Sequence, residues 1–533
     1  MKNIKELLTT LLSKDKFWLA AVFLITFAVY LPAVKFTNLI ADDTFYYLRT
    51  LAFCDSSSEL REALLSPDAP LTSLSFYADL LIWGKNNLIQ GAHFTNILLH
   101  CGTAVLFYLL LRSLKWAGQG LTPAWAGMAA LIFALHPQRV EAVVWFCERK
   151  DCLAMFTGVG AFLVFLWEMR RERFPVLSGL LLVLSLLSSS MWLFFFVPAA
   201  ALVWIERRSF EWKFYLKLLC IPVVIFALWI VCRLPGLLHG VSFPLTAEAL
   251  LYKAESILFN YGNYFLRTFI PGNLYPLYPH YNPASNPRWM ALIPVGLAAI
   301  PCFLIKEKAC RSAIIYGVLP VVVSFFFILI PMAGFFPDGM TDFADRYSYL
   351  PALFLIAASA FLLQLNIPIE SAFGRWLPVL GVLYCGGLGY KTELYIPAWE
   401  NKISYTQKSM SLHSPHVCAV METAINHFDR GEYDEALKVA DEKLSLPPHH
   451  TPLLKNSVTL FRLSLQGMVL CQQKKTDEGI LLLDRVFTPG NADLLCFFPD
   501  EFGKRVYKQY QKERKHPLNN LNPALKMIKE QKK

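Results

Sequence analysis

Two adjacent carboxylates follow the first long apolar stretch of the chain. They are Asp42 and Asp43, in the sequence ADDTFYYLRT. A carboxylate beside a hydroxyl group can take its proton, which makes both residues candidate catalytic bases for group transfer. Adjacent carboxylates can also hold Mg²⁺ or Mn²⁺, which prefer oxygen ligands, although the sequence shows no further ligand set. Such a pair is more often a solvated surface or a helix cap, so its meaning depends on its neighbours.

Ionisable side chains gather again in two later polar stretches, HPQRVEAVVWFCERKD from residue 136 and PDGMTDFADRYSYLP from residue 337. Guanidinium groups bind phosphate through forked hydrogen bonds, so Arg149 or Arg346 would neutralise a departing phosphate. Glu141 is the next candidate for the catalytic base. His136 is a third candidate for binding the phosphate. Asp151 and Tyr347 are further candidate site residues.

The elements that must position these residues are apolar helices. Hydrophobic residues make up 55% of the chain, charged residues only 17%, and the mean hydropathy is +0.41. A soluble globular protein usually has about 25% charged residues. The apolar residues fall in runs long enough to cross hydrocarbon about 30 Å thick. The sequence therefore predicts an all-α membrane helix bundle of about eleven spans: Phe17 to Val34, Phe94 to Leu111, Pro123 to Leu135, Cys152 to Trp167, Phe174 to Leu187, Met191 to Ile205, Leu218 to Val231, Trp289 to Ile305, Ser312 to Pro331, Tyr349 to Leu365 and Trp376 to Tyr390.

Lysine and arginine clusters occupy alternate gaps between these spans. This pattern indicates a cytoplasmic location for the clusters, and it accounts for the net charge of +10 without a nucleic-acid partner. Counting spans from a cytoplasmic N-terminus places every candidate site residue on the outer or lumenal face. The C-terminal domain is predicted on the same, extracytoplasmic side, either periplasmic or lumenal.

The composition changes abruptly beyond Tyr390, where apolar runs give way to charged helical segments. The stretch HVCAVMETAINHFDRGEYDEALKVADEKLSLPP, from residue 416, resembles a tetratricopeptide repeat (TPR), and a weaker copy has Gly467 and Gly479 at its small-residue positions. We therefore expect a transmembrane domain over 1–390 and a TPR-like helical domain over 391–533. An amphipathic helix from Thr246 to Ile270 is expected to lie on the outer membrane surface.

Three stretches together resemble the transmembrane and tetratricopeptide-repeat-containing (TMTC-like) branch of the GT-C glycosyltransferases, which is related to the protein O-mannosyltransferases. The first is the Asp-Asp pair, followed by Pro-Leu-Thr-x-Leu-Ser at Pro70 and HFTNILLH at His93. The second, His-Pro-x3-Glu-x-Val-x5-Arg-x-Asp, begins at His136. The third, Arg-Tyr-x-Tyr-x-Pro, begins at Arg346.

The resemblance implies a GT-C-like fold and a transferase that takes a sugar such as mannose from a polyprenyl-phosphate-linked donor. Asp42 or Asp43 would be its base, and a protein or glycan acceptor would be bound with help from the TPR-like domain. The chain departs from the family in one turn, where Ser188 to Met191 replaces a lysine-containing sequence. If that lysine contacts donor phosphate in relatives, the donor chemistry of this chain differs.

Two other functions remain open. A non-catalytic membrane scaffold would use the bundle as an anchor and the repeats to bind a partner. A transporter would need broken helices at matching positions, which the sequence does not show. The enzyme is the favoured interpretation, because a scaffold has no need of Asp42, Asp43, Glu141 and Arg149 together.

Overall fold

The computed structural model describes residues 14–513 apart from 56–60, 62–68, 117–118, 208–210, 240–245, 284–285, 297–315, 318, 331, 335–341, 367–373, 375, 413, 445, 447–451, 489–490, 492–497 and 499–501. Helices provide the regular structure of these residues, apart from a two-residue antiparallel ladder between β1 (Lys115–Trp116) and β2 (Gln119–Gly120). The all-α fold predicted from the sequence is therefore confirmed.

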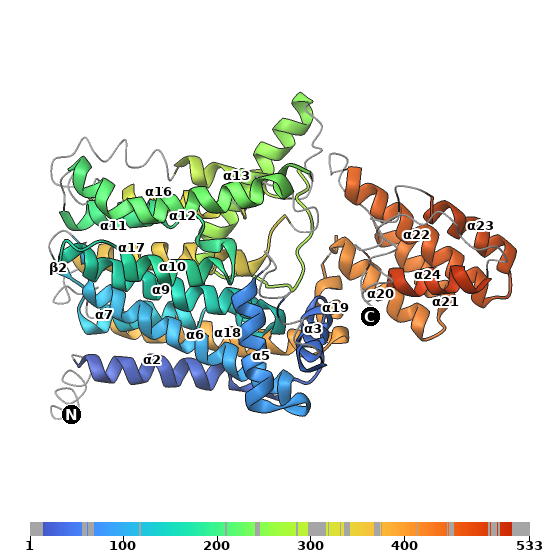
Figure 1. Cartoon of the computed structure of the whole chain (residues 1–533), viewed down its shortest axis with the longest axis horizontal. Coiled ribbons are helices and arrows are strands. Elements are labelled where there is room, and N and C mark those ends of the chain that lie inside the picture. Colours follow the sequence, from blue (N-terminus) through green and yellow to red (C-terminus); the bar gives the residue numbers. More distant parts are fainter. Residues whose placement is uncertain are drawn as a thin grey trace.

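The larger body is a bundle whose long helices run side by side along the long axis of the molecule (Figure 1). The first described residues lie at the end of the bundle that is far from the smaller, C-terminal body. The bundle helices are α2 (Asp15–Tyr30), α6 (Leu88–Ser113), α7 (Pro123–Ala134), α9 (Arg149–Arg170), α10 (Val176–Leu186), α11 (Phe196–Arg207), α12 (Trp212–His239), α16 (Leu319–Leu329), α17 (Pro351–Asn366) and α18 (Leu377–Tyr395).

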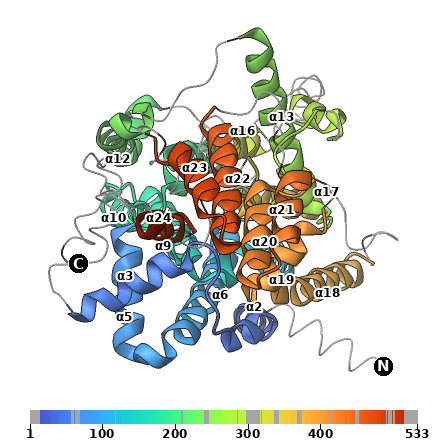
Figure 2. The same cartoon turned by 90° about the vertical axis from the view of Figure 1, so that its right-hand side faces the viewer.

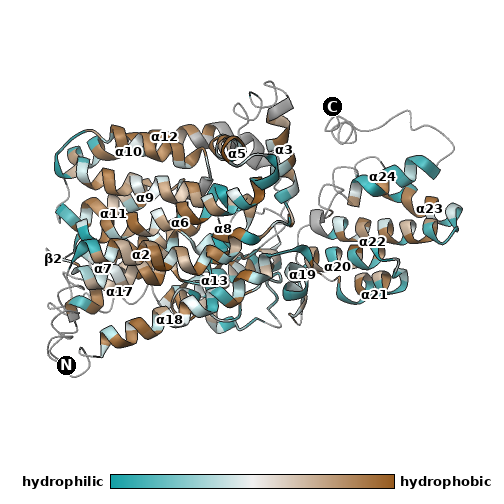
Figure 3. Cartoon of the chain, turned by 90° about the horizontal axis from the view of Figure 1, so that it is seen from below, coloured by the Kyte–Doolittle hydropathy of each residue, from teal (hydrophilic) through white to brown (hydrophobic). Residues whose placement is uncertain are grey.

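Among the described residues, three segments are long and apolar enough to cross a membrane: Asp15–Lys35, Lys85–Ser113 and Phe146–Arg170. Four shorter apolar helices accompany them in the bundle, which Figure 3 shows as mainly hydrophobic. The chain is therefore a membrane protein. The described helices overlap the predicted spans, except for the eighth, Trp289 to Ile305, most of which lies outside the described residues. The first part of the ninth, Ser312 to Pro331, also lies largely outside them.

Small residues allow the bundle helices to approach closely. Gly127 of α7 lies against the ring of Trp18 in α2, where an added Cβ would be 2.0 Å from a ring carbon. Gly158 of α9 lies against the ring of Trp192, where an added Cβ would be 2.1 Å from a ring carbon. Because packed interiors have few voids, a larger side chain at either glycine would displace the neighbouring tryptophan.

Short helices and turns form the end of the bundle nearest the C-terminal body (Figure 1). The helix α13 (Ala247–Phe269) begins where the Thr246 side chain accepts a hydrogen bond from the Ala249 N–H, which confirms the helix predicted for this stretch. Its location on the outer membrane surface stays a prediction. A further helix, α5 (Pro70–Trp83), was not predicted. The other elements at this end are α3 (Asp43–Asp55), α8 (Arg139–Val144), and the 3₁₀ turns η3 (Phe146–Glu148) and η7 (Asp345–Ser348).

The C-terminal body has its own hydrophobic core, contributed by α20 (Val417–Asp429), α21 (Tyr433–Lys443), α22 (Pro452–Gln472), α23 (Thr476–Val486) and α24 (Phe502–Glu513). The predicted first repeat forms the pair α20 and α21, with Ala436 fully buried. The weaker copy forms α22 and α23. There an added Cβ on Gly479 would lie 2.8 Å from the carbonyl oxygen of Gly467, which explains both small residues. Figure 2 shows this body facing the viewer.

The two bodies are joined by η8 (Ile396–Trp399) and α19 (Lys402–Met410). The side chains of Trp399 and Tyr405 in this junction belong to the hydrophobic core of the bundle. The composition change at residue 390 falls inside α18, which continues to Tyr395. The division into 1–390 and 391–533 stays a prediction.

Candidate functional site

The second polar stretch folds into a turn and a short buried helix that faces η7. The Arg139 N–H donates to the carbonyl of His136 at 2.8 Å, and all residues of α8 are buried. The Glu141 Oε2 accepts the backbone N–H of Arg346 at 3.0 Å, while its Oε1 is paired with the Nη1 of the same residue. One carboxylate therefore holds both the backbone and the side chain of Arg346.

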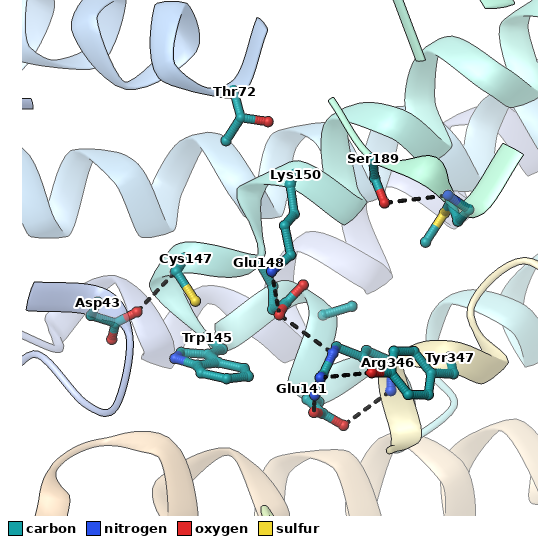
Figure 4. A network of polar contacts seen from close by, with 12 residues as sticks. Asp43, Thr72, Glu141, Trp145, Cys147, Glu148, Lys150, Ser189, Arg346 and Tyr347 are labelled. Atoms are coloured by element: carbon teal, nitrogen blue, oxygen red, sulfur yellow. Dashed lines mark hydrogen bonds and ion pairs between the residues drawn. The ribbon is translucent and has the colours of Figure 1, made fainter. Parts of the chain in front are cut away.

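A second buried carboxylate shares its charge between two cations (Figure 4). The Oε1 of Glu148, in η3, lies 3.2 Å from the Nζ of Lys150 and 3.5 Å from the Nε of Arg346. The side chains of Lys150 and Arg346 are 30% and 15% exposed, whereas that of Glu148 is 1% exposed. The buried anion thus orients two cations that stay partly accessible.

Aromatic rings restrict the guanidinium of Arg346. Its Cζ lies 4.6 Å from the ring centroid of Tyr347 and 5.5 Å from that of Trp145, distances at which a cation is attracted to the ring. Its Nη2 also donates to the Tyr347 hydroxyl at 3.2 Å. Trp145 in turn contacts Trp399, with ring centroids 5.5 Å apart. Arg346 therefore lies close to the junction between the two bodies.

The adjacent carboxylates of the first polar stretch have different surroundings. Asp43 is 1% exposed, and its two oxygens accept the backbone N–H groups of Ile40 at 3.0 Å and Cys147 at 2.9 Å. Burial raises the pKa of Asp43 to about 7, although these N–H groups oppose the shift. Asp42 is exposed. Asp43 therefore ties the loop after α2 to η3, and Asp42 is the accessible carboxylate.

Arg149 belongs to a separate network. It is fully buried, and its Nη2 donates to Asp79 Oδ2 at 2.6 Å and to the carbonyl of Ala92 at 2.8 Å. Its Nε donates to the side-chain oxygen of Asn96. These partners lie on α5 and α6. Arg149 thus joins three helices, and the structure does not bring it to Arg346.

His136 and Asp151 are both buried, in different roles. The Nδ1 of His136 accepts the Gln138 N–H at 3.3 Å. Burial, followed by the charge of Arg139, holds the pKa of His136 well below its usual value, so its ring is neutral at pH 7. Asp151 lies in the first turn of α9, close enough to Lys150 for their charges to interact. Asp151 therefore joins the charged cluster, while His136 adds no positive charge to it.

Glu141 titrates near neutral pH. Burial raises the pKa of Glu141 to about 7, although the charge of Arg346 opposes the shift. Below this pH the carboxyl group is protonated, and Arg346 loses one of its negative partners.

Among the described residues, no group of three or more His, Cys, Asp or Glu side chains is placed to hold a metal ion. Both oxygens of Asp43 accept backbone N–H groups, which leaves Asp42 as the accessible oxygen donor of the pair. A divalent cation at these two residues stays a prediction.

Comparison with known proteins gives short matches. No protein-family model matches the chain. Protein O-mannosyl-transferase TMTC4 of Homo sapiens is 35% identical over 102 residues, 18% of this chain. Protein O-mannosyl-transferase Tmtc1 of Drosophila melanogaster is 32% identical over 119 residues, 22% of this chain. The chain is related to the TMTC proteins. This confirms the resemblance predicted from its motifs, although the matched stretches span only 14% and 13% of the length of these two relatives.

A solved structure also resembles the chain. The crystal structure of the Archaeoglobus fulgidus oligosaccharyltransferase in the apo form aligns with 82% of this chain and 60% of that chain, with a TM-score of 0.40 and 14% identity.

Glu148, which pairs with Arg346, and Lys150, which pairs with Glu148, were not among the residues predicted from the sequence. Both lie within the stretch ERKD, in which η3 ends and α9 begins. Successive residues of a helix point about 100° apart, so Arg149 and Lys150 cannot face the same neighbours. This spacing indicates that the two side chains have different neighbours, although it does not indicate which of them is buried.

Proposed function

We propose that the chain is a membrane glycosyltransferase that moves a sugar from a polyprenyl-phosphate-linked donor to a hydroxyl group on an exported protein or glycan. The main support is the pair of partly exposed cations, Arg346 and Lys150, at the polar end of an apolar bundle. A lipid phosphate could contact both cations while its chain lies beside the spans. The names of the relatives support mannose as the sugar.

In the proposed reaction, the acceptor oxygen attacks the anomeric carbon of the donor sugar. The hydroxyl proton passes to Asp42, whose carboxylate is exposed. The bond between the anomeric carbon and the phosphate oxygen breaks, and its electron pair leaves with the polyprenyl phosphate. Arg346 and Lys150 stabilise the negative charge on that leaving group.

The other residues of the site act by positioning. Glu141 holds the backbone N–H of Arg346, Tyr347 contacts its guanidinium, and Asp43 holds the loop that presents Asp42. The contact between Trp145 and Trp399 supports a role for the C-terminal helices in bringing the acceptor to this end of the bundle. The proposed acceptor is therefore a protein or glycan held by the TPR-like body.

Arg346→Lys is expected to raise the apparent donor KM about tenfold, because an ammonium replaces forked hydrogen bonds with a point charge. The measurement uses purified full-length protein and a mannosyl-phosphoryl polyprenol. Arg207→Lys, at an exposed ion pair on α11, is the matched control and should keep the wild-type KM. An unchanged KM in Arg346→Lys would remove this residue from the phosphate site. A wild-type protein without transfer activity would favour the scaffold function.

Donor affinity is expected to fall as the pH rises through about 7. Below the pKa of Glu141, raised by burial to about 7, the carboxyl group is protonated and Arg346 can turn to the phosphate. Above it, the carboxylate competes with the donor, whose phosphodiester stays ionised throughout. Glu141→Gln should make the donor KM independent of pH across this range. A wild-type KM that improves with rising pH would contradict the proposed competition.

The proposal places the site and the TPR-like body on the extracytoplasmic side, with a cytoplasmic N-terminus. A tag after Lys533 is then expected to react with a membrane-impermeant reagent in sealed vesicles of known orientation or in intact cells. A tag before Met1 should be protected until the membrane is opened. The reverse pattern would overturn this orientation.

A further inference from the structure

The turn that contains Arg346 is held on one side by α8. The Gln138 Nε2 donates to Asp345 Oδ1 at 3.3 Å, and the Arg139 Nη2 donates to the Ser348 hydroxyl at 2.7 Å. With the contacts from Glu141, these bonds connect α8 to η7 on both sides of Arg346. The position of this arginine therefore depends on η7 staying in place.

Residues 247–283, which start with α13 and are called the outer segment below, hold the same part of the chain from another side. The Asn260 Nδ2 donates to the carbonyl of Asp342 at 2.8 Å. The Tyr264 hydroxyl lies 3.2 Å from both the N–H and the carbonyl oxygen of Ala344. The Tyr278 hydroxyl donates to Asp345 Oδ2 at 2.7 Å. These contacts hold Asp342, Ala344 and Asp345, which come shortly before Arg346 in the chain.

Asp345 connects the two sides. It is fully buried, and each carboxylate oxygen accepts from a different partner, Gln138 of the α8 stretch or Tyr278 of the outer segment. Tyr278 is itself fixed by Arg267 in the last turn of α13. The Nη1 of Arg267 donates to the Tyr278 hydroxyl at 2.9 Å, and its Cζ lies 4.9 Å from the ring centroid. The chain of contacts thus runs from α13 through Tyr278 to the residue before Arg346.

We propose that Tyr278 is a positioning residue for the lipid-phosphate site: through Asp345 it fixes the turn that presents Arg346. The outer segment then determines donor affinity without contacting the donor. The reason is geometric, since forked binding of a phosphate tolerates little displacement of the guanidinium. A hydrogen bond to a charged carboxylate is among the stronger ones available for this purpose. The inference rests on the proposed function, in which Arg346 binds the phosphate.

Tyr278→Phe tests this role, because it removes the hydroxyl and keeps the ring that packs against Phe343 and Arg267. Binding of a polyprenyl phosphate without sugar to the full-length protein is expected to weaken about tenfold. Tyr281→Phe is the matched control from the same segment. It loses a hydrogen bond to Glu255 at 3.2 Å and should bind like the wild type.

Combination with Arg346→Lys separates positioning from a general structural effect. If Tyr278 acts through Arg346, adding Tyr278→Phe to Arg346→Lys causes no further loss of binding. A further tenfold loss in the double variant would overturn the inference. So would weaker binding in Arg346→Lys together with wild-type binding in Tyr278→Phe, an outcome that leaves the proposed function intact.

Wild-type protein that binds no polyprenyl phosphate would instead overturn the proposed function. If Tyr278→Phe does not fold, Gln138→Leu tests the same bridge by removing its other half. It should weaken binding in the same direction and should likewise have no added effect on Arg346→Lys. Wild-type binding by a folded Gln138→Leu protein would overturn the inference.

Discussion

Replacing Asp42 by asparagine is expected to lower kcat for sugar transfer by about a hundredfold or more, because a positioned base contributes roughly that factor. The donor KM should stay unchanged, since the ion pairs of Arg346 and Lys150 are with Glu141 and Glu148. The melting temperature should also stay unchanged, because an exposed loop carboxylate contributes little to packing. The assay is steady-state transfer by purified protein at saturating donor.

Two further variants make this result specific. Glu248→Gln removes an exposed carboxylate from the first turn of α13 and should keep wild-type kcat. Asp43→Asn is expected to lower the melting temperature, because its buried oxygens accept the N–H groups of Ile40 and Cys147. Full activity in Asp42→Asn would exclude it as the base and direct attention to Glu141.

Arg149→Leu is expected to destabilise the protein by about 3–5 kcal/mol, because removing one member of a buried ion pair leaves the other charge unpaired. The pair joins Arg149 Nη2 and Asp79 Oδ2 at 2.6 Å, with side chains 0% and 3% exposed. Thermal unfolding in detergent, followed by helical circular dichroism, measures the effect. The double replacement of Arg149 and Asp79 by leucine should recover much of the lost stability.

The exposed pair of Arg207 and Glu172, 3.0 Å apart, provides the control. Surface pairs contribute about 0–1 kcal/mol, so Arg207→Leu should scarcely change the melting temperature. An Arg149→Leu protein that melts like the wild type but has lost donor affinity would return the phosphate role to Arg149. The experiment thus decides between the two arginines that the sequence left open.

The helices of the bundle could be predicted because each span is apolar along most of its length. The hydropathy of α2, α6 and α9 alone indicates that they cross the membrane. The TPR-like pairs were predictable for a different reason: small residues such as Ala436 and Gly479 recur where two helices touch. Both signals depend on residues close together in the sequence.

The roles of individual site residues depend on contacts between distant parts of the chain. Asp43 is distinguished from Asp42 by its bond to Cys147, 104 residues later. Arg149 is distinguished from Arg346 by Asp79, in a helix that the sequence did not predict. Neither the residues next to these side chains in the sequence nor the family motifs indicate either contact. The motifs therefore indicated the site but could not assign its side chains.

The serine turn that departs from the family pattern packs against the unpredicted helix α5. The Leu71 N–H donates to the carbonyl of Leu187 at 3.1 Å, and the Thr72 hydroxyl donates to the backbone carbonyl of Ser188 at 3.4 Å. Hydropathy predicted the two spans on either side of this turn, but not its contact with α5. The effect of the missing lysine on donor chemistry stays a prediction. In the proposed function, Lys150 is the lysine that binds the donor phosphate.

The packing of Trp399 against Trp145 has a practical consequence for building chimaeras. A graft that exchanges the C-terminal helices at residue 391 would replace Trp399 and Tyr405, which complete the core of the bundle. It would thereby change the packing of Trp145, whose ring lies beside Arg346, as well as the repeats. A join between α19 and α20 keeps both aromatic residues with their own bundle. An exchange of the C-terminal helices between relatives is therefore best attempted there, where the second hydrophobic core begins.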